Sequence, residues 1–481
     1  MVPVAFQSIA NMAPAASVAF SLLFAAPYAG GSTPLAIVVG LVACLLVAVT
    51  IGQLAKHLPS AGGLYTYNAR GLGPGAGFLV GWAFLLAEVV VAPGGLLILG
   101  SVVGSALNTD FGWPNWMWAP AAGLAGLLIW ALVHRGIRLA TAASVVLGLF
   151  EIVVFAALAV TLIVRGGPHN TGAVFTPHFH NAHGLGSIVP GVLYAVFGII
   201  GFEAAAPLGE EARDPQRTIP RAVVLACLGI GGFYLLCYYG MTVFFGPAKM
   251  ASLVNVGAGD PWSAVAQQVW GLGFIAVIIA LVNSSVAGSN ASSVATTRVG
   301  YALGRIGMLP KALTHINDKT GTPTIAVAVQ AVFAIAFALG VGFALGGPLK
   351  ALLLQGTIST VIIVVIYILT CASCVSYYLR ERRGEFSLLL HGVIPVLGAL
   401  VFVPVLLAGL GIDFGGLGIQ PLAYPATIAP WVIYAWLAAG AVVLGYFLVR
   451  DRQRLAQTRE LFTEAVGGGH EQPHGAARVR E

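Results

Sequence analysis

Residues 194–203 of the chain read Tyr-Ala-Val-Phe-Gly-Ile-Ile-Gly-Phe-Glu. They lie inside an apolar segment, roughly residues 185–207, that is long enough to cross a lipid bilayer as a helix. A plain membrane helix would hold leucines here, but this one holds Gly198, Gly201 and the carboxylate of Glu203. Glycine lets the backbone leave helical geometry. We therefore predict that this helix breaks near residues 198–201.

A second apolar segment, roughly residues 2–27, carries a similar interruption. Its inner half contains Gln7, Ser8, Asn11, Pro14 and Ser17. Proline removes a backbone donor and strains the preceding turn, so we predict a break near residues 11–17. A close helix crossing alone could explain the glycines of the other segment. Paired breaks at corresponding positions of two five-helix halves, however, indicate a substrate site at the bilayer midplane of an inverted-repeat transporter.

The whole chain has the composition of a membrane protein. Of its 481 residues, 58% are hydrophobic and 8% are charged, and the mean hydropathy is +0.92, which excludes a soluble globular protein. Continuous apolar runs favour helices over the alternating strands of a barrel. We predict twelve membrane-spanning helices, at residues 2–27, 33–56, 76–105, 116–133, 140–164, 185–207, 220–246, 264–300, 323–345, 350–379, 390–410 and 428–449.

The basic residues predict how the chain lies in the membrane. If both termini are cytoplasmic, 20 of the 23 Lys and Arg residues fall on the cytoplasmic side, and only Arg165, Lys249 and Lys350 fall outside. Short cytoplasmic loops carry such an excess. We therefore predict a multi-pass protein of the cell membrane with both termini inside. The same distribution explains the net charge of +6 without a nucleic-acid partner.

The domain organisation is expected to be simple. Residues 1–450 form one integral membrane domain, and residues 451–481 form a cytoplasmic tail whose glycines and mixed charges are typical of disorder. The outer loop at about residues 165–184 holds four histidines without supporting carboxylates or thiols, so we expect no metal site. These histidines are His169, His178, His180 and His183.

The paired breaks suit a zwitterionic substrate. A half-helix beginning near Ser17 would point its free N–H groups at a carboxylate, and unwound carbonyls near residues 197–200 would accept from an ammonium group. We expect no catalytic residue and no cofactor, with a proton or sodium as the coupling ion. The predicted substrate-binding residues are Asn11, Ala15, Ala16, Ser17, Phe197, Gly198, Ile200 and Gly201.

Three stretches carry a resemblance to a known family. Residues 58–67 read Leu-Pro-Ser-Ala-Gly-Gly-Leu-Tyr-Thr-Tyr, similar to a P-x-x-G-G-x-Y-x-Y signature. Gly201-Phe202-Glu203, with the loop at residues 210–221 that ends in Ile-Pro-Arg, looks like a G-F-E helix and its E-x-x-x-P-x-x-x-I-P-R loop. Residues 298–310 are similar to a segment that ends in G-x-L-P. In this order, they make the chain resemble the amino acid, polyamine and organocation permeases.

The resemblance implies a leucine-transporter-type fold that works by alternating access. Helices 1–5 and 6–10 would form inverted repeats, and helices 11 and 12 would be appended. One departure concerns helix 1, where many members have a Gly-x-Gly turn. This chain has Ala15-Ala16-Ser17 instead, so its backbone is less free to approach a carboxylate.

Three glutamates lie within predicted spans, where each costs several kcal/mol to insert. In the light of the resemblance, Glu203 has a gating or proton-linked role, or is a hydrogen bond that ties helix 6 to helix 1. Glu151 of helix 5 is the candidate coupling residue, with Ser284 and Ser285 of helix 8, although a serine-rich helix can also be only a packing face. Glu88 of helix 3 is either functional or a protonated carboxyl bonded to a neighbouring helix.

The sequence therefore predicts a secondary-active permease for amino acids or related small amines, coupled to protons in preference to sodium. A polyamine or organic-cation permease, a sodium-coupled or exchange transporter, and a transporter-like sensor stay open. An enzyme is not expected, because no cluster of intramembrane His or Asp is visible and no nucleotide-binding P-loop occurs. The charged loop after helix 6 could also form an inner gate. Its residues are Glu210, Glu211, Arg213, Asp214 and Arg217, with Arg305 as a candidate partner.

Overall fold

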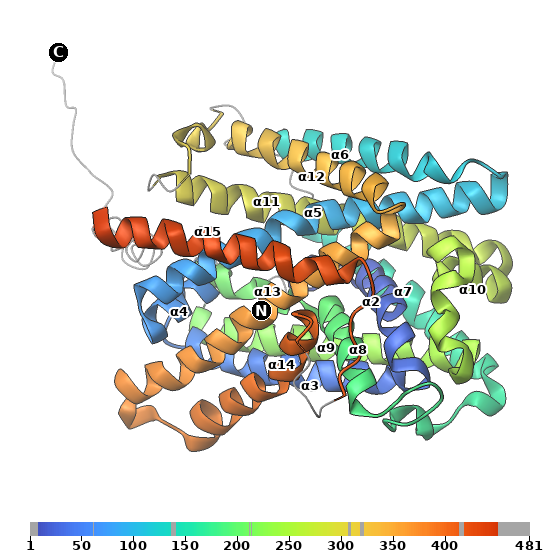
Figure 1. Cartoon of the computed structure of the whole chain (residues 1–481), viewed down its shortest axis with the longest axis horizontal. Coiled ribbons are helices and arrows are strands. Elements are labelled where there is room, and N and C mark those ends of the chain that lie inside the picture. Colours follow the sequence, from blue (N-terminus) through green and yellow to red (C-terminus); the bar gives the residue numbers. More distant parts are fainter. Residues whose placement is uncertain are drawn as a thin grey trace, which may run out of the picture.

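A computed structural model gives the architecture of the chain (Figure 1). It describes residues 8–60, 62–135, 141–210, 212, 214–305, 309–317, 322–412 and 418–450. Every regular element in these ranges is a helix, as the sequence predicts. The tail at residues 451–481 lies outside the described residues, so its predicted disorder stays a prediction.

The long helices follow one another along the chain with short connections. They are α2 (Pro14–Ala29), α3 (Thr33–Ala55), α5 (Pro74–Phe111), α6 (Trp118–His134), α7 (Thr141–Arg165), α8 (Leu185–Ile199), α9 (Pro215–Phe245), α11 (Phe274–Arg305), α12 (Thr324–Ala344), α13 (Pro348–Arg380), α14 (Ile394–Gly409) and α15 (Ala429–Arg450).

Shorter helices fill the connections between them. They are α4 (Leu64–Leu72) and α10 (Pro261–Trp270), the π-helix η10 (Leu388–Val393), and the 3₁₀ helices η1 (Gly30–Ser32), η2 (Asn115–Met117), η3 (Gly167–His169), η4 (Gly172–Phe175), η5 (Phe202–Glu210), η6 (Pro247–Gly259), η7 (Gly271–Gly273), η8 (Lys311–Thr314), η9 (Arg383–Glu385) and η11 (Ala426–Ile428).

The number of spans depends on how turns are counted. By length and composition, the described residues contain 10 helices that could cross a membrane, or 11 if the bent pair of α8 and η5 is one span. The first of these, Pro14–Ala55, includes both α2 and α3, which the turn η1 separates at Gly30 (φ +52°). With α2 and α3 counted apart, each of the twelve predicted spans has a helical counterpart.

Both predicted helix breaks are present. The first lies at Met12 and Ala13, between the helical residues 8–11 and α2. The second lies at Ile200 and Gly201, where α8 ends and η5 begins at an angle of 41°. Gly201 has a φ of +113°, which L-residues rarely adopt, and this explains why glycine stands there.

The helices that carry the breaks are packed in the interior of the bundle. Most of α2 is buried, and it lies against α8. Small residues allow this approach: a Cβ at Gly191 of α8 would lie 2.9 Å from the Cβ of Ala29. Around this pair, α5, α6, α11 and α12 run together along one side of the bundle, with α3 and α14 on the other (Figure 1).

A proline organises the interface of α5 with α11 and α12. Pro93 of α5 cannot donate to the carbonyl of Val89, and the side chain of Gln330 donates to that oxygen instead (3.3 Å). The neighbouring carbonyls accept from serines of α11: Ser292 donates to Glu88 O (2.7 Å) and Ser289 donates to Ala92 O (3.0 Å). These serines therefore join helices.

The connection between α14 and α15 holds the ends of α2 and α8 that lie away from the breaks. The backbone N–H of Ala423 donates to the hydroxyl of Tyr28 at the end of α2 (2.8 Å). The N–H of Gln420 donates to the carbonyl of Gly186 in the first turn of α8 (3.1 Å). The aromatic rings of Tyr28 and Tyr194 stack beneath this connection, with centroids 5.8 Å apart. These ends of α2 and α8 are thus joined by the same few residues.

Candidate functional site

The two helix breaks face each other. The hydroxyl of Ser8, before the first break, donates to the carbonyl of Phe202, after the second (2.9 Å). Gly201 packs directly on the first break, because a Cβ there would lie 3.2 Å from the side-chain nitrogen of Asn11 and from the backbone nitrogen of Met12. The hydroxyl of Tyr234 reaches the carbonyl of Met12 (3.5 Å). The predicted residues Asn11 and Gly201 therefore come together in the fold.

The half-helix after the first break begins earlier than the sequence analysis predicts. Ala13 has a left-handed backbone (φ 46°, ψ 68°), and Pro14 is the first residue of α2. Proline suits this position because its missing N–H would be unpaired there. The N–H of Ser17 already donates to the carbonyl of Ala13 (2.9 Å). The expected start near Ser17 is wrong, and the amides at the end of this half-helix belong to Ala15 and Ala16.

Glu151 of α7 binds this helix end. Its carboxylate Oε2 accepts from the N–H of Ala15 (3.4 Å), and its Oε1 accepts from the side-chain amide of Asn283 of α11. The hydroxyl oxygen of Ser284 accepts from the N–H of Ala16 (3.1 Å). Glu151 is only 2% exposed. The N–H groups that the sequence analysis assigns to a substrate carboxylate are thus occupied by the protein's own oxygens.

Glu203 serves the second break in a different way. Its Oε2 accepts from the N–H of Gly201, two residues before it (3.0 Å), and from the hydroxyl of Tyr367 of α13 (2.8 Å). The carboxylate therefore fastens the break between α8 and η5 to α13. The contact that joins helix 6 to helix 1 comes instead from Ser8 and the carbonyl of Phe202.

The other predicted residues of helix 6 line the approach to its break. The ring of Phe197 packs on α13, where a Cβ at Gly356 would lie 3.3 Å from the ring carbons. Gly198 lies against α2, since a Cβ there would be 2.7 Å from the hydroxyl of Ser21. Ile200 ends α8 in an extended conformation (φ −52°, ψ 138°). Phe197 is half-buried, whereas Gly198 is buried.

Two other predicted coupling residues, Ser285 and Glu88, have hydrogen bonds to groups other than Glu151. The hydroxyl of Ser285 donates to the carbonyl of Leu281 in its own helix (2.7 Å). Glu88 is on α5, where its backbone carbonyl accepts from Ser292. Ser292 is eight residues after Ser284, which corresponds to about 12 Å along α11. The structure therefore brings Glu151 and Ser284 together and leaves Glu88 at another level.

The two inner signature loops meet beneath the site. Gly63, in the loop before α4, has a φ of +47°, and a Cβ there would lie 3.3 Å from the ring of Pro207 in η5. This contact is apolar. In the predicted charged gate, Asp214 and Arg217 form an exposed pair (3.8 Å) within one turn of α9. Glu211 and Arg213 lie outside the described residues, as do the side chains of Glu210 and Arg305.

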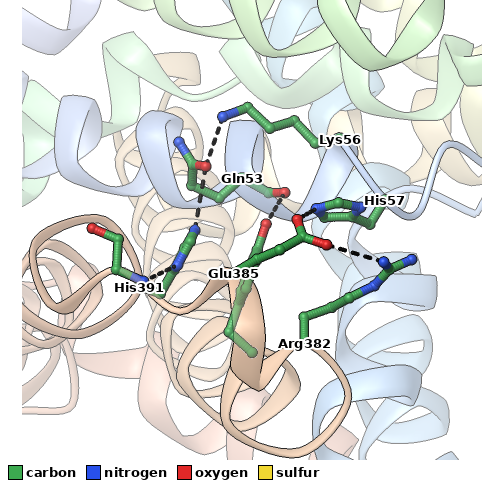
Figure 2. A network of polar contacts seen from close by, with 8 residues as sticks. Gln53, Lys56, His57, Arg382, Glu385 and His391 are labelled. Carbon is green, nitrogen blue, oxygen red and sulfur yellow. Dashed lines mark hydrogen bonds and ion pairs between the residues drawn. The ribbon is translucent and has the colours of Figure 1, made fainter.

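A polar network joins the inner end of α3 to the connection between α13 and α14 (Figure 2). Glu385 pairs with His57 (3.0 Å) and with Arg382 (3.0 Å). The N–H of Ser387 donates to Nδ1 of His391 (2.9 Å), so the other ring nitrogen carries the proton that points to Gln53 (3.4 Å). This network links α3 to the segment between α13 and α14, on the side that the basic residues mark as cytoplasmic.

The sequence analysis missed two residues of the site, Tyr367 and Tyr234, which contact the breaks. Each of them is a hydrogen-bonding side chain inside an apolar span. Such a side chain rarely lacks a partner, and this is the signal that could have identified them. Within the described ranges, no group of three or more His, Cys, Asp and Glu is placed to hold a metal ion.

Comparison with known proteins identifies the family. A family model described as "Amino acid permease" matches residues 4–442. The chain belongs to this amino acid permease family. The permease is thus a multi-pass membrane protein and a secondary transporter of amino acids or related amines, and it is not an enzyme.

Several characterised relatives show the range of cargo in the family. The permease is 28% identical over 322 residues to the low-affinity putrescine importer PlaP of Escherichia coli (strain K12), covering 66% of this chain and 69% of the relative. It is 27% identical over 456 residues to the branched-chain amino acid permease BcaP of Lactococcus lactis, covering 89% of each chain. It is 23% identical over 390 residues to the serine/threonine exchanger SteT of Bacillus subtilis, covering 78% of this chain and 84% of the relative.

Proposed function

We propose that the permease moves an amino acid or small amine together with a proton, and that Glu151 is the residue that couples the two. The observation that carries this proposal is the contact between the Glu151 carboxylate and the N–H of Ala15, directly after the break in helix 1. Glu151 comes from α7, so this contact joins two different helices at the level of the break. Its strength depends on the charge of the carboxylate, because a helix N-terminus favours an anion.

The surroundings of Glu151 favour a proton over sodium. Sodium would need several oxygen atoms turned toward one point. The groups that meet the two oxygens of Glu151 are instead hydrogen-bond donors, the N–H of Ala15 and the amide of Asn283, and Ser284 is engaged with the N–H of Ala16. Donors repel a cation, so this environment suits a carboxyl that exchanges a proton better than one that binds sodium.

A coupling cycle follows from competition between two anions. Ionised Glu151 occupies the N–H of Ala15, and protonation removes the charge that holds it there. The amides of Ala15 and Ala16 can then bind the carboxylate of an amino acid, while carbonyls at the end of α8 accept from its ammonium group. In this scheme the proton and the substrate enter together, and each favours the binding of the other.

The cargo decides whether this competition operates. Two of the relatives are named for amino acids, which carry a carboxylate, and one for putrescine, which does not. An amine without a carboxylate would leave Ala15 and Ala16 to Glu151 and Ser284. We therefore propose amino acids as the coupled cargo. The distribution of basic residues further supports a place in the cell membrane with both termini cytoplasmic.

Uptake by the purified protein in sodium-free proteoliposomes tests the coupling. An inward pH gradient should drive accumulation of amino acids by the wild type. Glu151→Gln, which cannot release a proton, should still exchange substrate across the membrane but should lose the gradient-driven accumulation by at least about tenfold. Glu385→Gln, at the exposed inner network, is the matched control and should accumulate substrate normally. Accumulation by Glu151→Gln, or a strict need for sodium, would contradict the proposal.

A further inference from the structure

Gln355 of α13 holds a buried oxygen atom without a partner. Its side chain is 1% exposed, and its Oε1 has no hydrogen-bond donor within reach. The nitrogen of the same amide donates to the hydroxyl of Ser359 (3.0 Å), which fixes the amide and turns its oxygen away from α13. Buried side-chain oxygens nearly always find a donor, so an unpartnered one needs an explanation.

The oxygen lies in a notch of α5. A Cβ at Gly94 would be 2.5 Å from Oε1 of Gln355, and its three nearest atoms would all belong to the Gln355 side chain. The absence of a side chain at Gly94 is therefore what makes room for the amide. At the neighbouring position, a Cβ at Gly95 would overlap the hydroxyl of Ser289 and lie 2.7 Å from the carbonyl of Ser285, so α11 packs closely on α5 here.

This notch adjoins the approach to the helix breaks. The next residue of α13, Gly356, packs on the ring of Phe197. Thr357 shares a hydrogen bond with the hydroxyl of Tyr194, one turn earlier on α8 (3.2 Å). Gln355 is thus held by the same stretch of α13 that faces the last turns of α8, on the outer side of the break at residues 200–201.

The other buried oxygens without partners in the described part of the chain lie elsewhere or are less enclosed. Ser60, Thr66 and Tyr67 belong to the loop after α3 and to α4, Ser263 belongs to α10, and Thr296 lies on α11 four residues beyond Ser292. Asn290 of α11 is only half-buried. Among these residues, Gln355 therefore combines a fully buried acceptor oxygen with a position next to the helix breaks.

We propose that the oxygen of Gln355 accepts a hydrogen bond from the end of the substrate that points away from the two helix breaks. The permease would then prefer substrates with an N–H or ammonium donor at that end over aliphatic substrates of the same shape. A site built to bind such a donor rejects the analogue that lacks it, because its acceptor stays unpaired. This inference rests on the proposed transport function but does not depend on the coupling ion.

Binding of matched ligand pairs to the purified protein tests the inference. The pairs are 1,4-diaminobutane with pentylamine, and asparagine with leucine. In each pair the members have similar size, but only the first carries a donor at its far end. Affinities come from ligand-dependent rises in melting temperature. The wild type should bind the donor-bearing member of at least one pair about tenfold more tightly.

Two substitutions should abolish this preference by different routes. Gln355→Met keeps the volume and removes the acceptor, and Gly94→Ala pushes the amide out of its notch without changing it. Both should bring the affinity ratio close to one by weakening the donor-bearing ligand alone. Gly75→Ala, in the first turn of the same helix, is the control, because its Cβ would make only an ordinary contact with Leu444 at 3.9 Å. If Gln355→Met does not fold, Gln355→Glu should raise the preference for the diamine over pentylamine.

The outcomes separate this inference from the proposed function. Binding that is intact in all variants, with the wild-type ratio unchanged, would overturn the role of Gln355 and leave transport untouched. A wild type that binds neither member of either pair would contradict the proposed function and this inference with it.

Discussion

The two helix breaks use the same kind of group in opposite ways. At the first break, the amides of α2 are bound by Glu151 of α7 and Ser284 of α11, which are groups from other helices. At the second break, the amide of Gly201 is bound by Glu203, which lies two residues further along the same segment. Glu151 approaches its break from another helix, whereas Glu203 belongs to the segment that contains its break and moves with it.

This difference assigns the breaks different tasks. A group from another helix can leave when helices move or when its charge changes, so in the proposed cycle the first break exchanges Glu151 for a substrate carboxylate. Glu203 stays beside Gly201 when the segment moves, because only two positions separate them, and Tyr367 fastens it to α13. We therefore expect the second break to be a permanent feature of the fold and the first to be the variable one.

The largest effect should come from a side chain at the second break. Gly201→Val places a β-branched residue at a φ of +113° and against Asn11 and Met12, so we expect uptake to be abolished. Uptake normalised to the amount of protein in the membrane is the measurement. Gly229→Val on α9 has open space and should transport normally. Normal uptake by Gly201→Val would remove this break from the site.

An intermediate effect should come from the carboxylate of the second break. Glu203→Gln keeps the shape but removes the charge that accepts two hydrogen bonds, and we expect a loss of about 2 kcal/mol in stability. Melting temperature should fall, and exchange and accumulation should decline together. A Glu203→Gln protein of unchanged stability that loses only accumulation would reverse the roles assigned to the two breaks.

The smallest effect should come from the backbone of the first break. Ala13 is left-handed (φ 46°) where glycine would fit without strain. Ala13→Gly removes a backbone strain of about 1 kcal/mol from the folded state, but it also raises the conformational entropy of the unfolded chain. The two effects on stability therefore nearly cancel. We expect stability to change by less than about 1 kcal/mol and uptake to be retained. Abolished uptake would show that the first break is as rigidly specified as the second.

The fold was largely predictable because the signals for it are local. Long apolar runs mark the helices, and Pro14, Gly198 and Gly201 mark the breaks. The exact start of α2 was not predictable, since it depends on a left-handed alanine at position 13, a residue type that gives no such signal. Sequence periodicity could place Glu151 on helix 5 but could not tell that its carboxylate reaches Ala15.

The partners within the site were less predictable because they come from distant parts of the chain. Glu203 and Tyr367 are separated by 164 residues, and Gln355 meets α5 at Gly94. A single glutamine in an apolar span is a signal, but only the packed structure shows that its oxygen has no donor. Hydrogen-bond satisfaction is a property of the assembled helices.

The last two helices also constrain how the transporter can open. Tyr28 of α2 and Gly186 of α8 both bond to residues 420–423, a segment that follows α14 and bonds to neither helix break. Opening toward the outside must therefore either break one of these bonds or carry both helix ends and the segment along as one body. In the first case, the length and rigidity of a connection far from the substrate would limit the speed of turnover.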